Sequence, residues 1–340
     1  MAKHNRPTII LLLAVFVISI LSIRYGAVYI SLSEIVSSLS KYFTTPESMS
    51  LNERIFMDIR LPRAILCLTV GAGLAVGGTL MQALFRNPIV EPGLVGTSSG
   101  AAFGSALYFV LGAVLHFNAG EWTLPIAACA GALLSTVLVF TLSQSSQTGK
   151  SSIIALLLTG IAINALFMSG VGFLSYIARD PQARSITFWG LGTLSGANWH
   201  SVAITFFTVI ICSVTALRFS NSLNALMLGE TEAAMLGVNV KRLKLIVLTI
   251  NVIMIAVCTA FVGVISFVGL IVPHLLRMTN GSDNRFLIRN SILLGGIILS
   301  AADLVARMLL RPAELPIGIV TSVIGVPVFI FLLRKKNYLF

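Results

Sequence analysis

Long stretches without a charged residue recur along the whole chain, and they constrain its fold more than any other feature. The stretch 64–85 is one of them. A membrane-spanning helix needs about 20 apolar residues, because each residue adds about 1.5 Å across a hydrocarbon core of about 30 Å. Only helices and closed barrels satisfy every backbone hydrogen bond there. The stretches do not alternate as barrel strands do, so the sequence predicts an all-α integral membrane protein.

Composition excludes a soluble domain that carries a single anchor. Hydrophobic residues make up 56% of the chain and charged residues only 10%, whereas a soluble domain has about 25% charged residues.

Two of the charge-free stretches need further division. The stretch 185–217 starts with a short Trp- and Gly-containing piece, and the stretch 245–276 is long enough for two helices with a break near 263–266. About ten spans are therefore expected, at 7–23, 64–85, 92–120, 122–149, 151–178, 185–217, 245–276 (two), 290–310 and 315–333.

The basic excess of the chain is best explained by membrane topology. Ten spans place both termini on one side, and that side holds fourteen basic and four acidic residues, against nine and eight on the other. Because basic residues concentrate in cytoplasmic loops, both termini are predicted to be cytoplasmic. The net charge of +11 is then a topology signal and not a nucleic-acid footprint. Two connections stand out: a long outer segment of mixed charge, 24–63, and a polar inner segment with helical character, 218–244.

No pattern indicates catalysis, a metal site or nucleotide binding. The four cysteines and four histidines are scattered. Residues 148–151 resemble the end of a phosphate-binding loop, but Gln144 stands where its first glycine is required. Asp303 lies four residues before Arg307, the spacing of an ion pair on one helix. The glycines at 73 and 77, and at 96, 100 and 104, have the spacing that lets helix backbones pack closely.

Specific strings resemble one known family. The sequence has Arg60-Leu-Pro-Arg63, Arg86-Asn-Pro88, Glu91-Pro-Gly93, Gly96-Thr-Ser-Ser-Gly100, Phe188-Trp189 with Gly192, Leu228-Gly229-Glu230 with Leu236-Gly237, Gly263 with Phe267-Val-Gly-Leu270, Pro273-His274, Ala302-Asp303 with Arg307, and Glu314-Leu-Pro-Ile-Gly318. Together these resemble the FecCD-type permease family, the membrane subunits of ABC importers for ferric siderophores, haem and vitamin B12. The resemblance covers the chain from about residue 54 onward.

The resemblance implies the type II ABC importer permease fold over a single transmembrane domain, 1–340, with 218–244 as a cytoplasmic coupling segment. It also implies a homodimer in the bacterial inner membrane, two cytoplasmic ATPase subunits and an extracytoplasmic substrate-binding protein. This chain would be a transport subunit and not an enzyme, it would bind no cofactor, and ATP and Mg²⁺ would belong to the ATPase. The expected cargo is an iron chelate, haem or a ferric siderophore, with cobalamin as the alternative. A secondary carrier or a membrane enzyme is less favoured, because no buried ionisable or catalytic constellation is evident.

Site residues carry over from the family by position. Arg60 and Arg307 match the outward arginines that meet glutamates of the binding protein, a contact for which the planar guanidinium is suited. Arg184, Phe188 and Trp189 fall where the translocation pathway is lined. The residues that match the coupling pattern toward the ATPase are Leu228, Gly229, Glu230, Ala233, Leu236 and Gly237.

Overall fold

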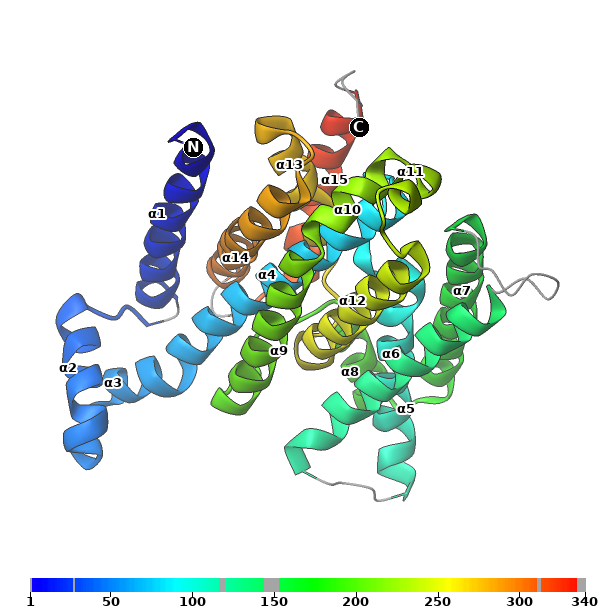
Figure 1. The fold of residues 1–340 in the computed structure, drawn as a ribbon. Helices are drawn as coiled ribbons and strands as arrows, with labels where there is room; N and C mark the ends of the chain where they lie inside the picture. The colour runs from blue at the N-terminus through cyan, green and yellow to red at the C-terminus, as the bar shows by residue number, and fades with distance from the viewer. Residues whose placement is uncertain (1, 27, 116–119, 144–152, 311–312, 335–340) are drawn as a thin grey trace.

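The computed structural model describes residues 2–26, 28–115, 120–143, 153–310 and 313–334, and these form helices joined by short connections (Figure 1). The loop-like segment 148–151 lies outside the described residues. The elements are α1 (Ala2–Arg24), α2 (Leu32–Thr44), η1 (Pro46–Ser48), α3 (Leu51–Ile55), η2 (Phe56–Arg60), α4 (Leu61–Phe85), η3 (Pro92–Val95), α5 (Thr97–Leu115), η4 (Gly120–Trp122), α6 (Thr123–Leu142), α7 (Ile153–Ile177), α8 (Asp180–Gly190), α9 (Trp199–Arg218), α10 (Ser220–Leu228), α11 (Glu230–Met235), α12 (Val240–Val262), α13 (Val268–Asn280), α14 (Asn284–Leu309) and α15 (Ile317–Arg334).

Each predicted span coincides with a helix. Within the described residues, seven helices are long and apolar enough to cross a membrane, and α13 and α15 are shorter apolar helices. The predicted break near 263–266 is confirmed, because α12 ends at Val262 and α13 begins at Val268. The short piece in 185–217 belongs to α8, which precedes α9. Helix α5 lies within the remaining predicted span, 92–120, so ten helices match the ten predicted spans. The number that crosses the bilayer stays a prediction.

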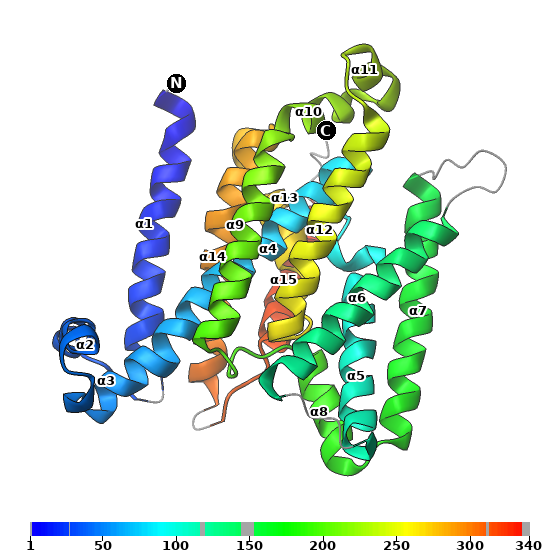
Figure 2. The same ribbon diagram turned by 60° about the horizontal axis from the view of Figure 1, so that its bottom comes forward.

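The two ends of the bundle differ in what they carry. Figure 2 shows both chain termini at the same end as α10 and α11, whereas α2, α3 and α8 lie at the opposite end. This arrangement agrees with an even number of spans. It also places the two polar connections on opposite sides, as the charge distribution predicts.

Helix α4 forms the centre of the bundle and is buried on nearly every face. It packs most extensively against α14, and a Cβ atom added at Gly71 would overlap the backbone carbonyl of Gly295. On another face of α4, a Cβ at Gly78 would overlap the backbone of Gly269 in the first turn of α13. Small residues are required here because lipid supplies no hydrophobic drive for helix association, so van der Waals packing at short range must hold the helices together.

The glycine stripe of α5 serves the same purpose. A Cβ at Gly100 would overlap the carbonyl of Gly131, and a Cβ at Gly104 would overlap the carbonyl of Ala127, both on α6. The packing interpretation of this stripe is therefore confirmed.

A single methyl group should disrupt the α4–α14 contact. We expect Gly71→Ala to lower the free energy of unfolding by about 1–3 kcal/mol, because the helices must separate to accept the new Cβ. Gly172→Ala is the matched control, since nothing lies within 4 Å of a Cβ at that position of α7. The readout is the thermal unfolding midpoint of each purified variant in detergent. Equal midpoints for the two variants would contradict the close-packing argument.

Candidate transport and coupling sites

A buried charge network connects α4 and α14 at the end of the bundle opposite the termini. Asp303 is fully buried, and its Oδ1 accepts hydrogen bonds from Nε and Nη2 of Arg63 at 3.0 and 2.8 Å. Its Oδ2 forms an ion pair with Nε of Arg307 at 2.9 Å, which confirms the pair predicted from the sequence spacing. Glu314 adds a more exposed carboxylate to Arg63 at 2.9 Å. One buried aspartate therefore joins two arginines from different helices.

Arg60 and Arg307 bind the backbone where α1 ends. The Nη1 atoms of both donate to the carbonyl of Tyr25 at 3.2 Å, and Nη2 of Arg307 donates to the carbonyl of Ser22 at 3.1 Å. These carbonyls lie at the C-terminal end of a helix, where intrahelical donors are missing. Arg60 is 7% exposed and Arg307 only 4%. The family resemblance implies that both arginines lie at the outer face and meet glutamates of a binding protein. In the structure both side chains are buried against the chain itself, and their part in docking stays a prediction.

The residues predicted for the pathway divide between two faces of α8. Arg184 and Phe188 are exposed, whereas Trp189 is 7% exposed and packs against small residues of α5 and α12. Trp189 lines two cavities, of about 300 and 270 Å³. The structure thus places Trp189 inside the protomer and leaves Arg184 and Phe188, one turn apart, on its surface.

The connection after α8 is held by backbone contacts among three helices. Gly192 and Gly263 both have positive φ, 74° and 75°, a conformation that glycine adopts without strain. The N–H of Thr193 donates to Val262 at the end of α12, and the carbonyl of Gly192 accepts from Ile317 at the start of α15. A Cβ at Gly263 would overlap the Trp189 carbonyl. We call this the α8 junction, formed by 189–193, 262–264 and 317–318.

The larger of the two cavities contains a carboxylate that the sequence argument did not single out. Glu91, just before η3, lines it together with Asn164 and Ser99, which hydrogen-bond to each other. Glu91 Oε1 accepts from the backbone N–H of Phe267 at 3.1 Å, at the start of α13. The sequence signal that could have identified Glu91 was the Glu91-Pro-Gly93 string, which precedes a helix.

The segment 218–244 is helical, as predicted. Helices α10 and α11 meet at Gly229, whose φ of 142° favours glycine. Ala233 is buried, whereas Leu228 and Leu236 are exposed, as is Met235, which the sequence argument did not include. A turn at Gly237, also with positive φ, leads into α12. The result is an exposed apolar surface at the end of the bundle that holds both termini.

Two sets of polar contacts attach these short helices to the bundle. Lys244 in the first turns of α12 pairs with Glu230 at 2.7 Å. Asn224 of α10 accepts the backbone N–H of Asn284 and donates to Asp283, both at 2.8 Å, at the start of α14. Glu230 therefore has a structural partner in this chain. No group of three His, Cys, Asp or Glu residues in the described ranges could hold a metal ion.

The FecCD transport family profile matches residues 11–335. The chain belongs to the FecCD transport family. The hemin transport system permease protein HmuU of Yersinia pestis is 41% identical over 305 residues, covering 89% of this chain and 90% of that protein. The vitamin B12 import system permease protein BtuC of Vibrio vulnificus is 36% identical over 336 residues, covering 98% and 96%.

A solved structure supports the same assignment at the level of the fold. A chain described as part of an inward-facing ABC transporter of the metal-chelate type superposes with a TM-score of 0.85. It is 32% identical, and the match covers 97% of this chain and 99% of that one. As a FecCD family member with many apolar helices, the chain is a multi-pass membrane protein and the permease subunit of an ABC importer.

The two carboxylates that pair with Arg63 should differ sharply in importance. We expect Asp303→Ala to lower the free energy of unfolding by about 3–5 kcal/mol, because it removes the buried carboxylate that Arg63 and Arg307 share and leaves Arg307 without its ion pair. Glu314→Ala should cost less than about 1 kcal/mol, because the Glu314 side chain is 42% exposed. Thermal unfolding of both variants in detergent provides the comparison. A similar loss for both would show that burial does not set the strength of the network.

Proposed function

We propose that this chain imports an iron chelate, haem or a ferric siderophore, across the bacterial inner membrane. The observation that carries this proposal is the family match, with a hemin permease sharing 41% of the aligned residues. Cobalamin is the second candidate, favoured by the vitamin B12 permeases among the relatives. An ion-coupled carrier is disfavoured by membership of an ATP-driven family.

The proposed assembly contains two copies of this chain as a homodimer, each a single transmembrane domain over 1–340. Two cytoplasmic ATPase subunits supply ATP and Mg²⁺ chemistry, and an extracytoplasmic binding protein delivers cargo. Large exposed apolar side chains along α7, such as Phe173 and Tyr176, provide a surface that a second copy or lipid can cover. Nothing in the proposal requires this chain to bind a cofactor or nucleic acid.

Coupling is assigned to α10 and α11, at the end predicted to be cytoplasmic. Short helices seated in a groove of the ATPase transmit its closure as a rigid-body motion. The exposed apolar side chains of this segment support the assignment, because a soluble ATPase surface would remove them from water. Gly229 and Gly237 set the angles at which α11 leaves α10 and enters α12.

Docking is assigned to Arg60 and Arg307 at the opposite end. Carboxylates of a binding protein would compete with the carbonyls of Ser22 and Tyr25 for the same guanidinium groups. A charge-assisted hydrogen bond is stronger than one to a neutral carbonyl. Docking through these arginines would therefore loosen the end of α1.

Reconstituted uptake tests the function. The chain, its ATPase and its binding protein are placed in liposomes, and uptake of haem, a ferric siderophore and cobalamin is measured with and without ATP. We expect uptake of an iron chelate that disappears when ATP or the binding protein is omitted. Cobalamin uptake alone would replace the cargo assignment, and uptake without ATPase would overturn the importer mechanism.

The same uptake assay tests the role of Arg184. Arg184 is exposed, one helical turn from Phe188, so its guanidinium can attract an anionic chelate. We therefore expect Arg184→Gln to lower uptake of an anionic chelate several-fold. Uptake of a neutral siderophore complex by the same variant is the control. Equal loss for both cargoes would assign Arg184 a role other than attraction of charge.

If α11 contacts the ATPase, a substitution on its exposed surface should reduce uptake without affecting the stability of the fold. We expect Met235→Asp to lower ATP-dependent uptake by at least about tenfold, because a charge on the apolar surface opposes seating in the ATPase, at a cost above about 1.4 kcal/mol. Thr231→Ala, on the same helix, should retain uptake. The unfolding midpoint of Met235→Asp should match the wild type, since Met235 is 82% exposed. Normal uptake by Met235→Asp would remove α11 from the coupling surface.

A further inference from the structure

Helix α2 turns several polar side chains toward the rest of the chain, together with Ile35, and carries a stripe of large apolar side chains on its exposed side. Ser38 is fully buried, and Glu34, Ser37 and Lys41 turn toward the rest of the chain. The opposite face carries large exposed apolar side chains at the i, i+4, i+7, i+11 spacing of one helical stripe. These residues, which we call the α2 apolar face, are Leu32, Val36, Leu39 and Phe43.

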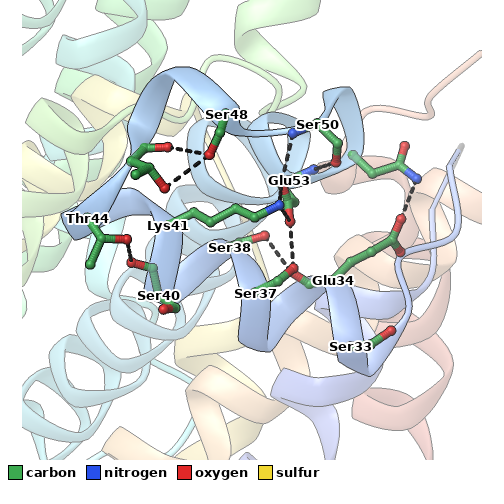
Figure 3. Close-up of polar contacts among 12 residues, drawn as sticks. Ser33, Glu34, Ser37, Ser38, Ser40, Lys41, Thr44, Ser48, Ser50 and Glu53 are labelled. Atoms are coloured by element: carbon green, nitrogen blue, oxygen red, sulfur yellow. Dashed lines mark hydrogen bonds and ion pairs between the residues drawn. The ribbon is translucent and has the colours of Figure 1, made fainter.

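The polar face is fixed in place by α3. Glu53, itself 3% exposed, forms an ion pair with Lys41 at 2.9 Å and accepts a hydrogen bond from Ser37 at 2.6 Å (Figure 3). Asn52 donates to Glu34 at 2.7 Å. Hydrogen bonds from Asn52 and from Ser31 hold the pKa of the Glu34 carboxyl below its usual range.

Two capping boxes fix the N-terminal ends of α2 and α3. The side chain of Ser31 accepts from the N–H of Glu34 while the Glu34 carboxylate accepts from the N–H of Ser31, and Ser50 and Glu53 repeat the pattern at α3. The same two carboxylates thus cap the helices and join them. Because α2 is held this way, its apolar face cannot rotate inward without breaking the network.

Something apolar must cover a face held outward in this way. Val36 is 69% exposed and Phe43 is 83% exposed. The helix lies beside the end of α1, and it runs across the α1 axis: Figure 2 views α2 nearly end-on while α1 is seen from the side. Helix α1 itself presents Leu13 and Phe16 outward, and only 6% of its most apolar window is buried. The α2 apolar face therefore belongs to a helix next to the end of a predicted membrane span whose own side chains are exposed.

We propose that α2 lies in the outer membrane interface with its apolar face inserted among the acyl chains. An amphipathic helix that runs along the membrane plane buries such a face at the boundary between headgroups and acyl chains. Exposed Tyr29 and Tyr42 flank the face, and tyrosine is enriched at this depth. The chain passes from α2 through α3 and η2 directly to Arg60, so the membrane surface sets the position of that arginine. The proposal rests on the membrane placement of α1 and not on the cargo.

Spin labels on single cysteines test this placement. The full-length protein is placed in nanodiscs of phosphatidylcholine and phosphatidylglycerol, with labels at Val36→Cys and Phe43→Cys and a control label at Glu47→Cys in the turn before α3. The partly exposed Cys129 is replaced by alanine, and the protein without an added cysteine gives the background. Collisions of each label with oxygen, which partitions into lipid, are compared with collisions with a water-soluble nickel chelate.

We expect the ratio of oxygen to nickel collisions to be at least several-fold higher at 36 and 43 than at 47. Brominated lipid should likewise quench a fluorophore on the first two cysteines and not on the third, which gives a second readout on the same folded protein. Equal access of the nickel chelate at all three sites would place the face in water and overturn the proposal. Protection of 36 and 43 from both oxygen and nickel would also overturn it, because a protein surface and not lipid would cover the face.

Discussion

The structure depends on the absence of water in the bilayer, which forces each backbone polar group to find a partner inside the chain. Backbone groups are satisfied within helices, and the helices then approach through glycine, as at Gly71 and Gly295. Charged groups follow the same constraint. Asp303 is tolerated deep between α4 and α14 because Arg63 and Arg307 approach it from two sides. The absence of water therefore explains both the close packing of this bundle and the composition of the ion network around Asp303.

The arginine cluster links this constraint to assembly. Arg307 contacts Asp303 within the bundle and the carbonyls at the end of α1, so it connects the extensively packed pair of α4 and α14 to a helix that is exposed almost throughout. Arg60, the last residue of η2, binds the same end of α1 through its hydrogen bond to the carbonyl of Tyr25. A partner that engages these guanidinium groups has to replace backbone carbonyls. Under the proposed function, the anchoring of α1 and the docking of a binding protein are thus competing uses of one pair of side chains.

The sequence predicted most of the fold because span length and hydropathy depend on local composition. It located the break after Val262 and the helical character of 218–244. The burial of Arg60 was not predictable, because it depends on the path of α1, which is distant in sequence. Helix α2 was missed for another reason: the segment 24–63 lacks a long apolar run, although the Ser-x-x-Glu signals at Ser31 and Ser50 were present. Capping patterns are informative where hydropathy is not.

The two ends of the transporter are connected through α12. This helix begins just after the turn at Gly237 and is paired to α11 through Lys244. It ends at Val262, and the following Gly263 lies against the carbonyl of Trp189. A helix of 23 residues spans about 35 Å. Gly192 and Gly263 have no side chains, so the backbone at the end of α8 lies directly against the backbone at the end of α12. A displacement of one backbone at the α8 junction would therefore move the other. Under the proposed function, a movement of α11 reaches Trp189 and the two cavities it lines through one rigid helix.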